Sequence, residues 1–175
     1  DAVFATTGKA GRELDEVRIA LDSDPAPDFL NVGAMGHVNQ IALGVAQAQP
    51  NRRVWCLDGD GAILMHMGAL AVLGQHAGEN FKHVVLNNGV HDSVGGQPSV
   101  GLQIDIPAIA KACGYKSAKR IGDDDDLAAA LQELADTPGP CLLEVGLAPG
   151  ARKELGRPKT TTAQRRVRLM DWLAK

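Results

Sequence analysis

The sequence predicts an α/β fold in which a doubly wound, mainly parallel sheet carries helices on both faces. Two observations indicate this fold. Short apolar runs alternate with segments of helical periodicity, and no internal repeat or low-complexity linker interrupts the alternation. In addition, the apolar runs 54–57 and 83–86 are separated by one helix-length segment. Each run ends in a polar turn, which is the pattern of a βαβ unit.

Apolar runs and apolar periodicity define the expected elements. Strands are expected at residues 2–6, 53–57, 82–86, 115–120 and 141–145, and helices at residues 11–21, 37–48, 62–75, 106–113 and 127–134. The first helix carries Leu14, Val17 and Leu21 on one face at helical spacing, and Pro25 and Pro27 then mark a loop.

The later helices differ in how their surfaces are expected to be covered. The helix at 37–48 is rich in Ala and apolar on nearly all sides, so we expect it to be buried between the sheet and a partner. In the helix at 106–113 the apolar residues recur at positions i, i+3, i+4 and i+7. The acidic run 123–126 precedes the helix at 127–134 and suits a helix N-terminus, where carboxylates interact favourably with the dipole.

Length and charge limit the possible functions. The 175 residues form one domain large enough to bury a core, and the net charge of −3 gives no electrostatic basis for binding nucleic acid or an acidic membrane. Residues 151–175 form a basic tail and helix, expected to belong to the same domain or to a subunit contact. Its clustered basic residues are Arg152, Lys153, Arg157, Lys159, Arg165, Arg166 and Arg168. A solvated helix or a subunit contact explains them better than nucleic-acid binding.

The cysteines and the hydropathy pattern indicate the cellular compartment in which the protein is expected. Cys56, Cys113 and Cys141 are isolated and show neither a CxxC pair nor metal-ligand spacing, so we interpret them as buried apolar residues in a reducing compartment. The sequence shows no apolar run of membrane-spanning length and no signal-peptide pattern. We therefore expect a cytoplasmic protein.

Polar residues follow two neighbouring strands of the predicted sheet. Asp58-Gly59-Asp60-Gly61 follows the first, and Asn87-Asn88-Gly89 follows the second. Because parallel strands present their carboxyl ends at one edge of a sheet, Asp60 and Asn88 are expected to meet there. Carboxylate and amide oxygens suit a hard divalent cation, which commonly bridges to phosphate. Either segment alone could equally be a simple Asp-Gly or Asn-Gly turn.

Together the two segments resemble the thiamine diphosphate motif, in which Gly-Asp-Gly and Asn-Asn hold Mg²⁺ against the diphosphate of the cofactor. Three further segments extend the resemblance to the diphosphate-binding half of the phosphonopyruvate and sulfopyruvate decarboxylases, over residues 1–150. They are Thr6-Thr-Gly-Lys-Ala-Gly-Arg-Glu-Leu14, Asn31-Val-Gly-Ala-Met-Gly-His37 and Asn87-Asn-Gly-Val-His-Asp-Ser-Val-Gly-Gly-Gln97. The tail after residue 151 has no clear counterpart.

The resemblance assigns the metal and the diphosphate to residues at the strand ends. It implies that Mg²⁺ is bound by the Asp60 carboxylate, the Asn88 side-chain oxygen and the main-chain carbonyl of Val90. Gly59 belongs to the same motif, while Gly61 and Ala62 open a helix, so their N–H groups could face the diphosphate. Thr7, Gly8 and Lys9 are further candidates for the diphosphate, and Lys9 could alternatively meet the anionic tail of a substrate or be a surface lysine.

The neighbouring polar residues are given structural roles. Asn87 is expected to support its turn. Asp58 is expected to point to the opposite strand face from Asp60, as a surface or capping carboxylate. Glu144 on the last strand is expected to be structural, as are His66, His76 and His83.

The remaining site residues are expected to act on the reacting part of the cofactor. By the resemblance, Gly33 offers its carbonyl to the aminopyrimidine, and Met35 holds the two rings in a bent shape unless it is ordinary core packing. His91 lies in a Gly-Gly loop expected to close over the cofactor, where it could donate a hydrogen bond or relay a proton. Alternatively it only caps Asp92. His37 could point toward the cofactor or into an interface.

The resemblance also implies a partner. The family needs a glutamate from a pyrimidine-binding domain, and nothing in this chain matches that acid. We therefore expect the β half of a hetero-oligomeric enzyme, or the C-terminal domain of a longer one, that is inactive alone. The implied reaction is decarboxylation of 3-phosphonopyruvate to phosphonoacetaldehyde, or of sulfopyruvate to sulfoacetaldehyde. A non-catalytic cofactor-binding module and a 2-oxo acid oxidoreductase are the other possibilities, although the latter would need iron–sulfur clusters that three scattered cysteines do not supply.

Overall fold

The structure is a computed structural model that describes residues 1–175. Six strands form one sheet in the order β2-β1-β3-β4-β8-β7, and every neighbouring pair is parallel. The predicted α/β fold with a parallel sheet is therefore confirmed.

The elements follow the expected segments closely. The strands of the sheet are β1 (Ala2–Ala5), β2 (Asp28–Leu30), β3 (Val54–Gly59), β4 (Phe81–Asn87), β7 (Ser117–Ile121) and β8 (Cys141–Gly146). The helices are α1 (Lys9–Ala20), α2 (Val38–Ala48), α3 (Asp60–Met65), α4 (Gly68–His76), α5 (Ile106–Cys113), α6 (Leu127–Asp136) and α7 (Thr162–Leu173). A small hairpin of β5 (Val90–His91) and β6 (Gln97–Pro98) encloses the 3-10 turn η1 (Asp92–Val94).

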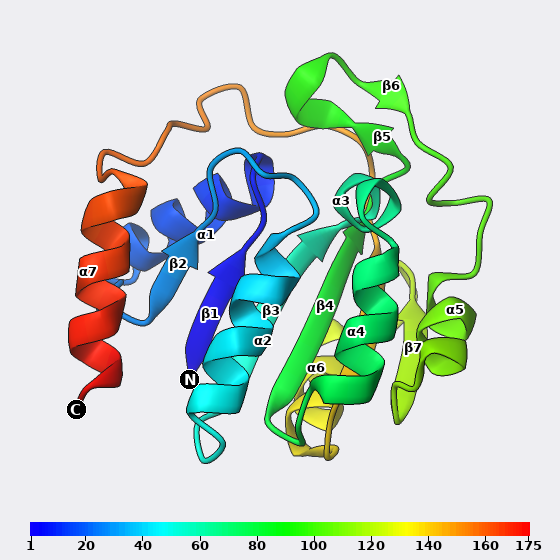
Figure 1. The fold of residues 1–175 in the computed structure, drawn as a ribbon. Helices are drawn as coiled ribbons and strands as arrows, with labels where there is room; N and C mark the ends of the chain where they lie inside the picture. The colour runs from blue at the N-terminus through cyan, green and yellow to red at the C-terminus, as the bar shows by residue number, and fades with distance from the viewer.

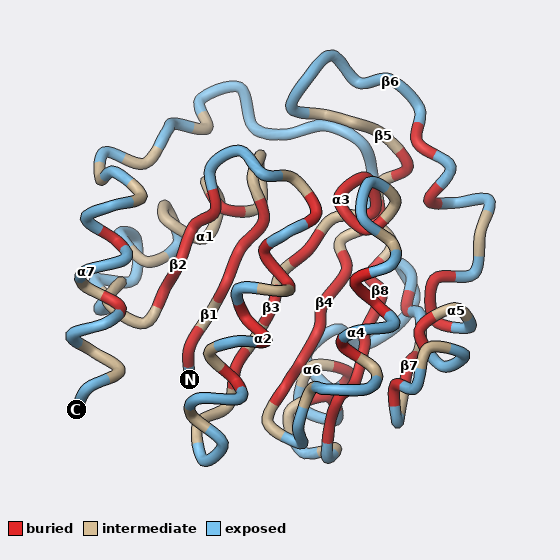
Figure 2. Tube along the Cα trace, in the orientation of Figure 1, coloured by how far each residue is buried: buried red, intermediate tan, exposed pale blue.

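Helices cover both faces of the sheet. In Figure 1, α2 and α4 lie in front of the sheet, and α6 lies behind it. The larger apolar cluster, which includes Val38, Leu70 and Ile106, forms the core under α2, α4 and α5. The smaller cluster joins β4 and β8 to α6 through residues such as Leu143 and Leu134. Figure 2 shows buried residues concentrated along the strands and exposed positions along the helices.

Three details differ from the sequence-based expectations. Residues 28–30 form an additional short edge strand, β2. The helix expected at 62–75 is two helices, because the chain leaves helical geometry at His66, with φ −137° and ψ 50°, and a new helix begins at Gly68. In α2, one face is buried and Ile41 is 38% exposed on the other.

The acidic run behaves as expected at its end. Asp126 precedes α6, and its carboxylate accepts a hydrogen bond from the N–H of Ala129 at 3.0 Å. It therefore caps the helix, as the sequence predicted.

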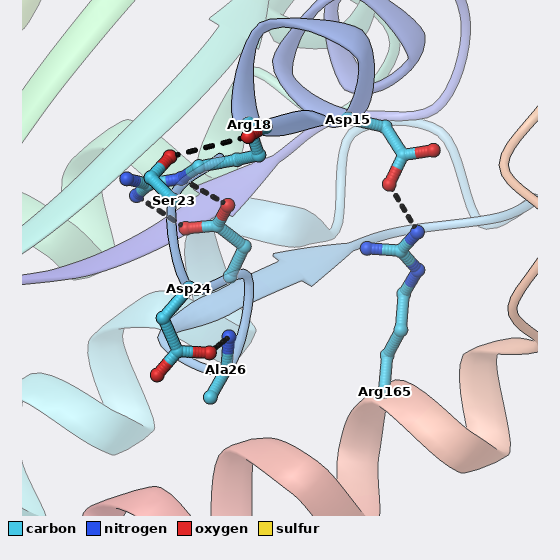
Figure 3. Close-up of polar contacts among 7 residues, drawn as sticks. Asp15, Arg18, Ser23, Asp24, Ala26 and Arg165 are labelled. Atoms are coloured by element: carbon cyan, nitrogen blue, oxygen red, sulfur yellow. Dashed lines mark hydrogen bonds and ion pairs between the residues drawn. The ribbon is translucent and has the colours of Figure 1, made fainter. Parts of the chain in front are cut away.

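The C-terminal segment folds back onto the sheet and is not merely a solvated helix. Helix α7 packs along β2, and Leu169 belongs to the larger apolar cluster. Arg165 is only 4% exposed and reaches Asp15 of α1 at 2.6 Å, as Figure 3 shows. Upstream in the tail, Arg152 contacts both Glu13 and Glu16 at 2.7 Å. Acidic residues of α1 thus hold the basic tail, so of the alternatives considered from the sequence the contacts favour a part of the same domain over a solvated helix.

The cysteines are free, with Cys56 and Cys141 buried and Cys113 partly buried. They therefore behave as small apolar residues. None of the helices combines the length and the apolar character needed to cross a membrane.

Candidate functional site

A cavity of about 390 Å³ lies where β1, β3 and β4 end. Every site residue predicted from the sequence lines this cavity except Gly33. The lining members of that set are Thr7, Gly8, Lys9, Met35, Gly59, Asp60, Gly61, Ala62, Asn88, Val90 and His91. Residues from four separate segments of the chain thus come together at the carboxyl edge of the sheet, where α/β folds bind ligands.

Asp60 is the first residue of α3 and is 3% exposed. Its Oδ2 accepts a hydrogen bond from the Ser99 hydroxyl, and the N–H of Gly101 donates to Ser99 Oγ at 3.1 Å. A side chain at Gly101 would place its Cβ 2.6 Å from Asp60 Oδ2, so only glycine allows this approach. Sequence reasoning missed Ser99 and Gly101, since neither belongs to a recognisable motif.

Asn88 and Asp92 organise the opposite wall. The Asn88 amide donates to Asp92 Oδ2 at 2.8 Å, and Asn88 Oδ1 accepts from the N–H of Val90 at 3.2 Å. Asp92 also faces Lys9 Nζ at 3.6 Å and accepts from the N–H of Gly150 at 2.9 Å. Asp92 therefore joins three segments of the chain, a role that its position in the sequence did not reveal. No hydrogen bond connects His91 to Asp92, so His91 is not a cap for that residue.

Met35 and His91 meet at the start of α3. A Cβ added to Gly61 would lie 2.6 Å from His91 Cε1 and 3.1 Å from Met35 Cε. Both side chains therefore rest against the bare backbone of Gly61, and a larger residue at this position would displace them.

The turn that carries Met35 has an unusual backbone. Gly33 and Ala34 have φ values of +72° and +43°, and Ala34 is thus a rare non-glycine residue in the left-handed region. Asn31 holds this turn, because its amide donates to the carbonyls of Gly33 at 3.0 Å and Ala34 at 3.2 Å. Gly33 is exposed and does not line the cavity. Its carbonyl accepts the hydrogen bond from the Asn31 amide.

His37 follows the same turn and lies outside the cavity. Its ring lies against that of His66 in a tilted arrangement with centroids 4.4 Å apart, and its Nδ1 is 3.2 Å from the carbonyl oxygen of Met35. Of the two orientations considered from the sequence, the structure gives His37 an exposed position that does not border the cavity.

Asp58 is fully buried, so the expectation of a surface carboxylate was wrong. Side chains of β3 alternate between buried and partly buried, and Asp58 falls on the buried face with Cys56. Its Oδ2 accepts from Asn39 Nδ2 at 2.8 Å and lies 3.6 Å from His83 Nε2, while Oδ1 accepts from the N–H of Gly59 at 3.1 Å. Asp58 and Asp60 were expected on opposite faces of the strand, but residues two apart on a strand point to the same face. Only the start of α3 at Asp60 gives the Asp60 side chain a different direction.

The group of Cys56, Asp58 and His83 is close enough to suggest a second metal site. His83, however, already contacts the Tyr115 hydroxyl through Nδ1 at 2.9 Å, and Asp58 is engaged as described above. Burial raises the pKa values of Cys56 and Tyr115, which keeps both groups protonated at neutral pH. We interpret this group as a structural network in the core.

Asn87 supports its turn, as predicted. Its Oδ1 accepts from the N–H of Gly89 at 3.1 Å, and its amide donates to the carbonyl of Gly101 at 2.8 Å and to Glu144 at 2.6 Å. Glu144 is 1% exposed and pairs with Arg120 at 2.9 Å, which agrees with the structural role expected for it.

The charge of the cavity fits a metal-bridged anion better than a bare one. Four acidic residues line it, Glu13, Asp58, Asp60 and Asp92, and Lys9 is the only lysine or arginine among the lining residues. A diphosphate alone would be repelled by these carboxylates. A divalent cation would supply the missing positive charge and would find the oxygen ligands that it prefers.

Comparison with known proteins places the chain in a family. The model of "Thiamine pyrophosphate enzyme, C-terminal TPP binding domain" matches residues 16–145. The chain is 47% identical to phosphonopyruvate decarboxylase of Streptomyces viridochromogenes over 163 residues, which cover 93% of this chain and 40% of that protein. It is 33% identical to sulfopyruvate decarboxylase subunit beta of Methanothermobacter thermautotrophicus over 150 residues, 86% of this chain and 75% of that subunit.

A solved structure agrees with this family assignment. An X-ray structure of a proposed thiamin diphosphate-dependent enzyme from Mycobacterium smegmatis superposes with a TM-score of 0.60 and 25% identity, over 85% of this chain and 29% of that one. The chain spans about two fifths of the length of the phosphonopyruvate decarboxylases that it matches. The position of the cavity, its lining residues and these matches lead to one conclusion: the chain belongs to the thiamine pyrophosphate enzymes, as their C-terminal TPP-binding domain.

Proposed function

We propose that the chain is the diphosphate-binding half of a thiamine diphosphate- and Mg²⁺-dependent decarboxylase whose substrate is 3-phosphonopyruvate and whose product is phosphonoacetaldehyde. The observation that carries this proposal is the convergence of Asp60, Asn88, Val90 and Met35 on one cavity. These residues come from three separate segments of the chain, and a domain that only kept the fold would not need them together.

The metal would be held by Asp60, Asn88 and the main-chain carbonyl of Val90. Ser99 now donates to Asp60 Oδ2, so the Asp60 carboxylate is already held in place before a cation arrives. The N–H groups of Gly61 and Ala62 at the start of α3 would bind the diphosphate. Thr7 and Gly8 would add donors from the loop after β1.

Met35 and His91 would border the reacting end of the bound cofactor. Thiamine diphosphate, when bound, would supply a carbon nucleophile for the 2-oxo carbonyl and an electron sink for the decarboxylation. Met35 contributes shape, because its thioether is fixed against Gly61. His91 meets the same glycine and can donate a hydrogen bond or a proton to the substrate. Gly33, on the exposed side of the turn, would face the pyrimidine-binding half.

Sulfopyruvate is the second candidate substrate. The sulfopyruvate decarboxylase β subunit is matched over 75% of its own length, so a separate chain of this size exists among the relatives. In either case we infer that a pyrimidine-binding partner subunit or domain supplies the catalytic glutamate. None of the acidic residues that line the cavity is assigned that role.

Replacement of Asp60 tests the metal assignment. Asp60→Ala should remove the Mg²⁺ dependence of thiamine diphosphate binding and weaken it about tenfold or more, since a charged ligand is lost. Calorimetry with and without Mg²⁺ measures this effect. Asp126→Ala is the matched control, because Asp126 also stands at a helix start but caps α6 instead of lining the cavity. Equal affinity in wild type and Asp60→Ala would contradict the assignment.

The activity itself requires the partner. The purified chain should decarboxylate neither 3-phosphonopyruvate nor sulfopyruvate, whereas the chain mixed with its pyrimidine-binding half should turn over one of them. Carbon dioxide release on both substrates, measured side by side, identifies the preferred one. Cofactor binding without turnover of either substrate in the complete assembly would favour a non-catalytic module.

A further inference from the structure

A second cavity, of about 620 Å³, adjoins the cofactor cavity and shares with it Thr6, Thr7, Gly8 and Ser93. Its other wall is the C-terminal tail, residues 157–162, together with Arg165 of α7. The tail and the loop after β1 therefore enclose a space directly beside the proposed cofactor site.

The charge of this second cavity is opposite to that of the first. Arg12, Arg157, Lys159 and Arg165 line it, and no acidic residue does. Arg165 is paired with Asp15 at 2.6 Å (Figure 3), whereas the other three form no ion pair. Three cations without an acidic partner, around a space lined by no carboxylate, create a positive potential that attracts an anion.

Three of the residues that line the same space carry hydrogen-bonding atoms without a partner. Thr6 Oγ1, Thr160 Oγ1 and Arg165 Nε are buried without a hydrogen-bond partner, and they are three of only five such side-chain atoms in the chain. Thr6 and Arg165 are 5% and 4% exposed. A buried donor left unpaired costs about 1–3 kcal/mol, so the concentration of three in one cavity indicates a ligand that would satisfy them.

The start of α7 adds a further favourable element. Helix α7 has 12 residues and begins at Thr162, which lines the cavity together with Thr160 and Thr161. The partial positive charge of a helix N-terminus favours an anion. Thr161 already caps the helix, so its hydroxyl is occupied.

We propose that this cavity binds a tetrahedral oxyanion of the phosphonate, phosphate or sulfonate class. Such a group offers three acceptor oxygens to the hydroxyls of Thr6 and Thr160 and to Arg165 Nε, and its charge is balanced by Arg12, Arg157 and Lys159. Lys9 suits the role less well, because it already faces Asp92. Identification of this anion with the distal group of the substrate rests on the proposed function.

Binding of simple anions tests the site without the reaction. Inorganic phosphate and methylphosphonate should bind the purified protein in calorimetry at low ionic strength, and acetate should bind much more weakly. Thr160→Val, which removes only the unpaired hydroxyl, and the double variant Arg157→Gln/Lys159→Gln should each weaken phosphate about tenfold to a hundredfold. Lys153→Gln/Arg166→Gln removes the same charge from the same tail outside the cavity and should change the affinity less than threefold.

A thermal shift separates binding from folding. Thr160→Val should unfold at the temperature of the wild type without anion, and should lose the rise in Tm that phosphate gives the wild type. Equal weakening in the two double variants would mean nonspecific charge attraction and would overturn the proposal. Absence of phosphate binding, or loss of binding in Lys9→Gln alone, which lies in the cofactor cavity, would overturn it as well.

The source of the anion is decided in the enzyme assembled with its pyrimidine-binding half. If phosphate competes with 3-phosphonopyruvate, and if Arg157→Gln/Lys159→Gln raises KM without changing kcat, the anion is the distal group of the substrate. A change in rate by phosphate without competition identifies free phosphate as the ligand. If the assembly decarboxylates nothing, the proposed function fails while the anion-binding result stands or falls separately.

Discussion

Replacement of Asp58 tests whether its buried carboxylate holds the end of β3. The carboxylate accepts hydrogen bonds from Asn39 Nδ2 and from the N–H of Gly59, at 2.8 and 3.1 Å, beside His83 Nε2 at 3.6 Å. Asp58→Ala leaves both donors unpaired, and each costs about 1–3 kcal/mol, so the free energy of unfolding should fall by about 2–6 kcal/mol. Asp58→Asn keeps one acceptor and should lose about 1–3 kcal/mol.

Urea unfolding followed by circular dichroism measures these differences. Because a domain of this size loses about 2–4 °C in Tm per kcal/mol, Asp58→Ala should also melt visibly earlier. Asp123→Ala is the control, since Asp123 is exposed in the same acidic run that precedes α6 and should stay within about 0.5 kcal/mol of wild type. A variant Asp58→Ala as stable as this control, or Asp58→Asn less stable than Asp58→Ala, would refute the reasoning.

Three further predictions concern the cavity and the core. Met35→Leu should keep most activity in the assembled enzyme, whereas Met35→Gly should lower kcat far more than cofactor affinity; equal rates for both would make Met35 ordinary packing. Gly36→Ala should destabilise the protein by at least about 1 kcal/mol, because the φ of Gly36 is +85° and the new Cβ would lie 2.7 Å from the carbonyl oxygen of Ala62. Gly44→Ala in α2 is the control. It should be neutral or stabilising in the same urea assay, because no atom lies within 4 Å of the new Cβ. Burial lowers the pKa of Lys82 in the folded protein. Between this lowered pKa and the ordinary value of about 10.4, the unfolded chain binds more protons than the folded one, so the free energy of unfolding should rise with pH across that window. Lys82→Met should lack this rise in unfolding experiments at several pH values.

The fold and most of the cavity could be predicted because their signals are local. Apolar runs locate the strands, and the strand order then delivers Asp60 and Asn88 to one edge of the sheet. The family resemblance added Met35 and His91, which do lie together at Gly61. The structure thus brings together residues that the sequence could only name one segment at a time.

Other features depend on contacts between distant segments and left no local signal. Ser99 reaches Asp60 across 39 positions, and Arg165 reaches Asp15 across 150. The burial of Asp58 follows from the packing of α2 over β3, which supplies Asn39 as a partner. The break between α3 and α4 likewise depends on tertiary contacts, because Gly36 packs directly against His66.

The contacts of Asp92 have a consequence for chimeric proteins made from relatives of this domain. Asp92 contacts Lys9, Asn88 and the backbone of Gly150, and the nearby Arg152 contacts Glu13 on α1, the helix that begins at Lys9. A graft that exchanges the 88–98 hairpin or the C-terminal tail alone would separate residues that fit one another. Transplants should therefore carry three pieces as one set, namely the start of α1, the hairpin and residues 150–152.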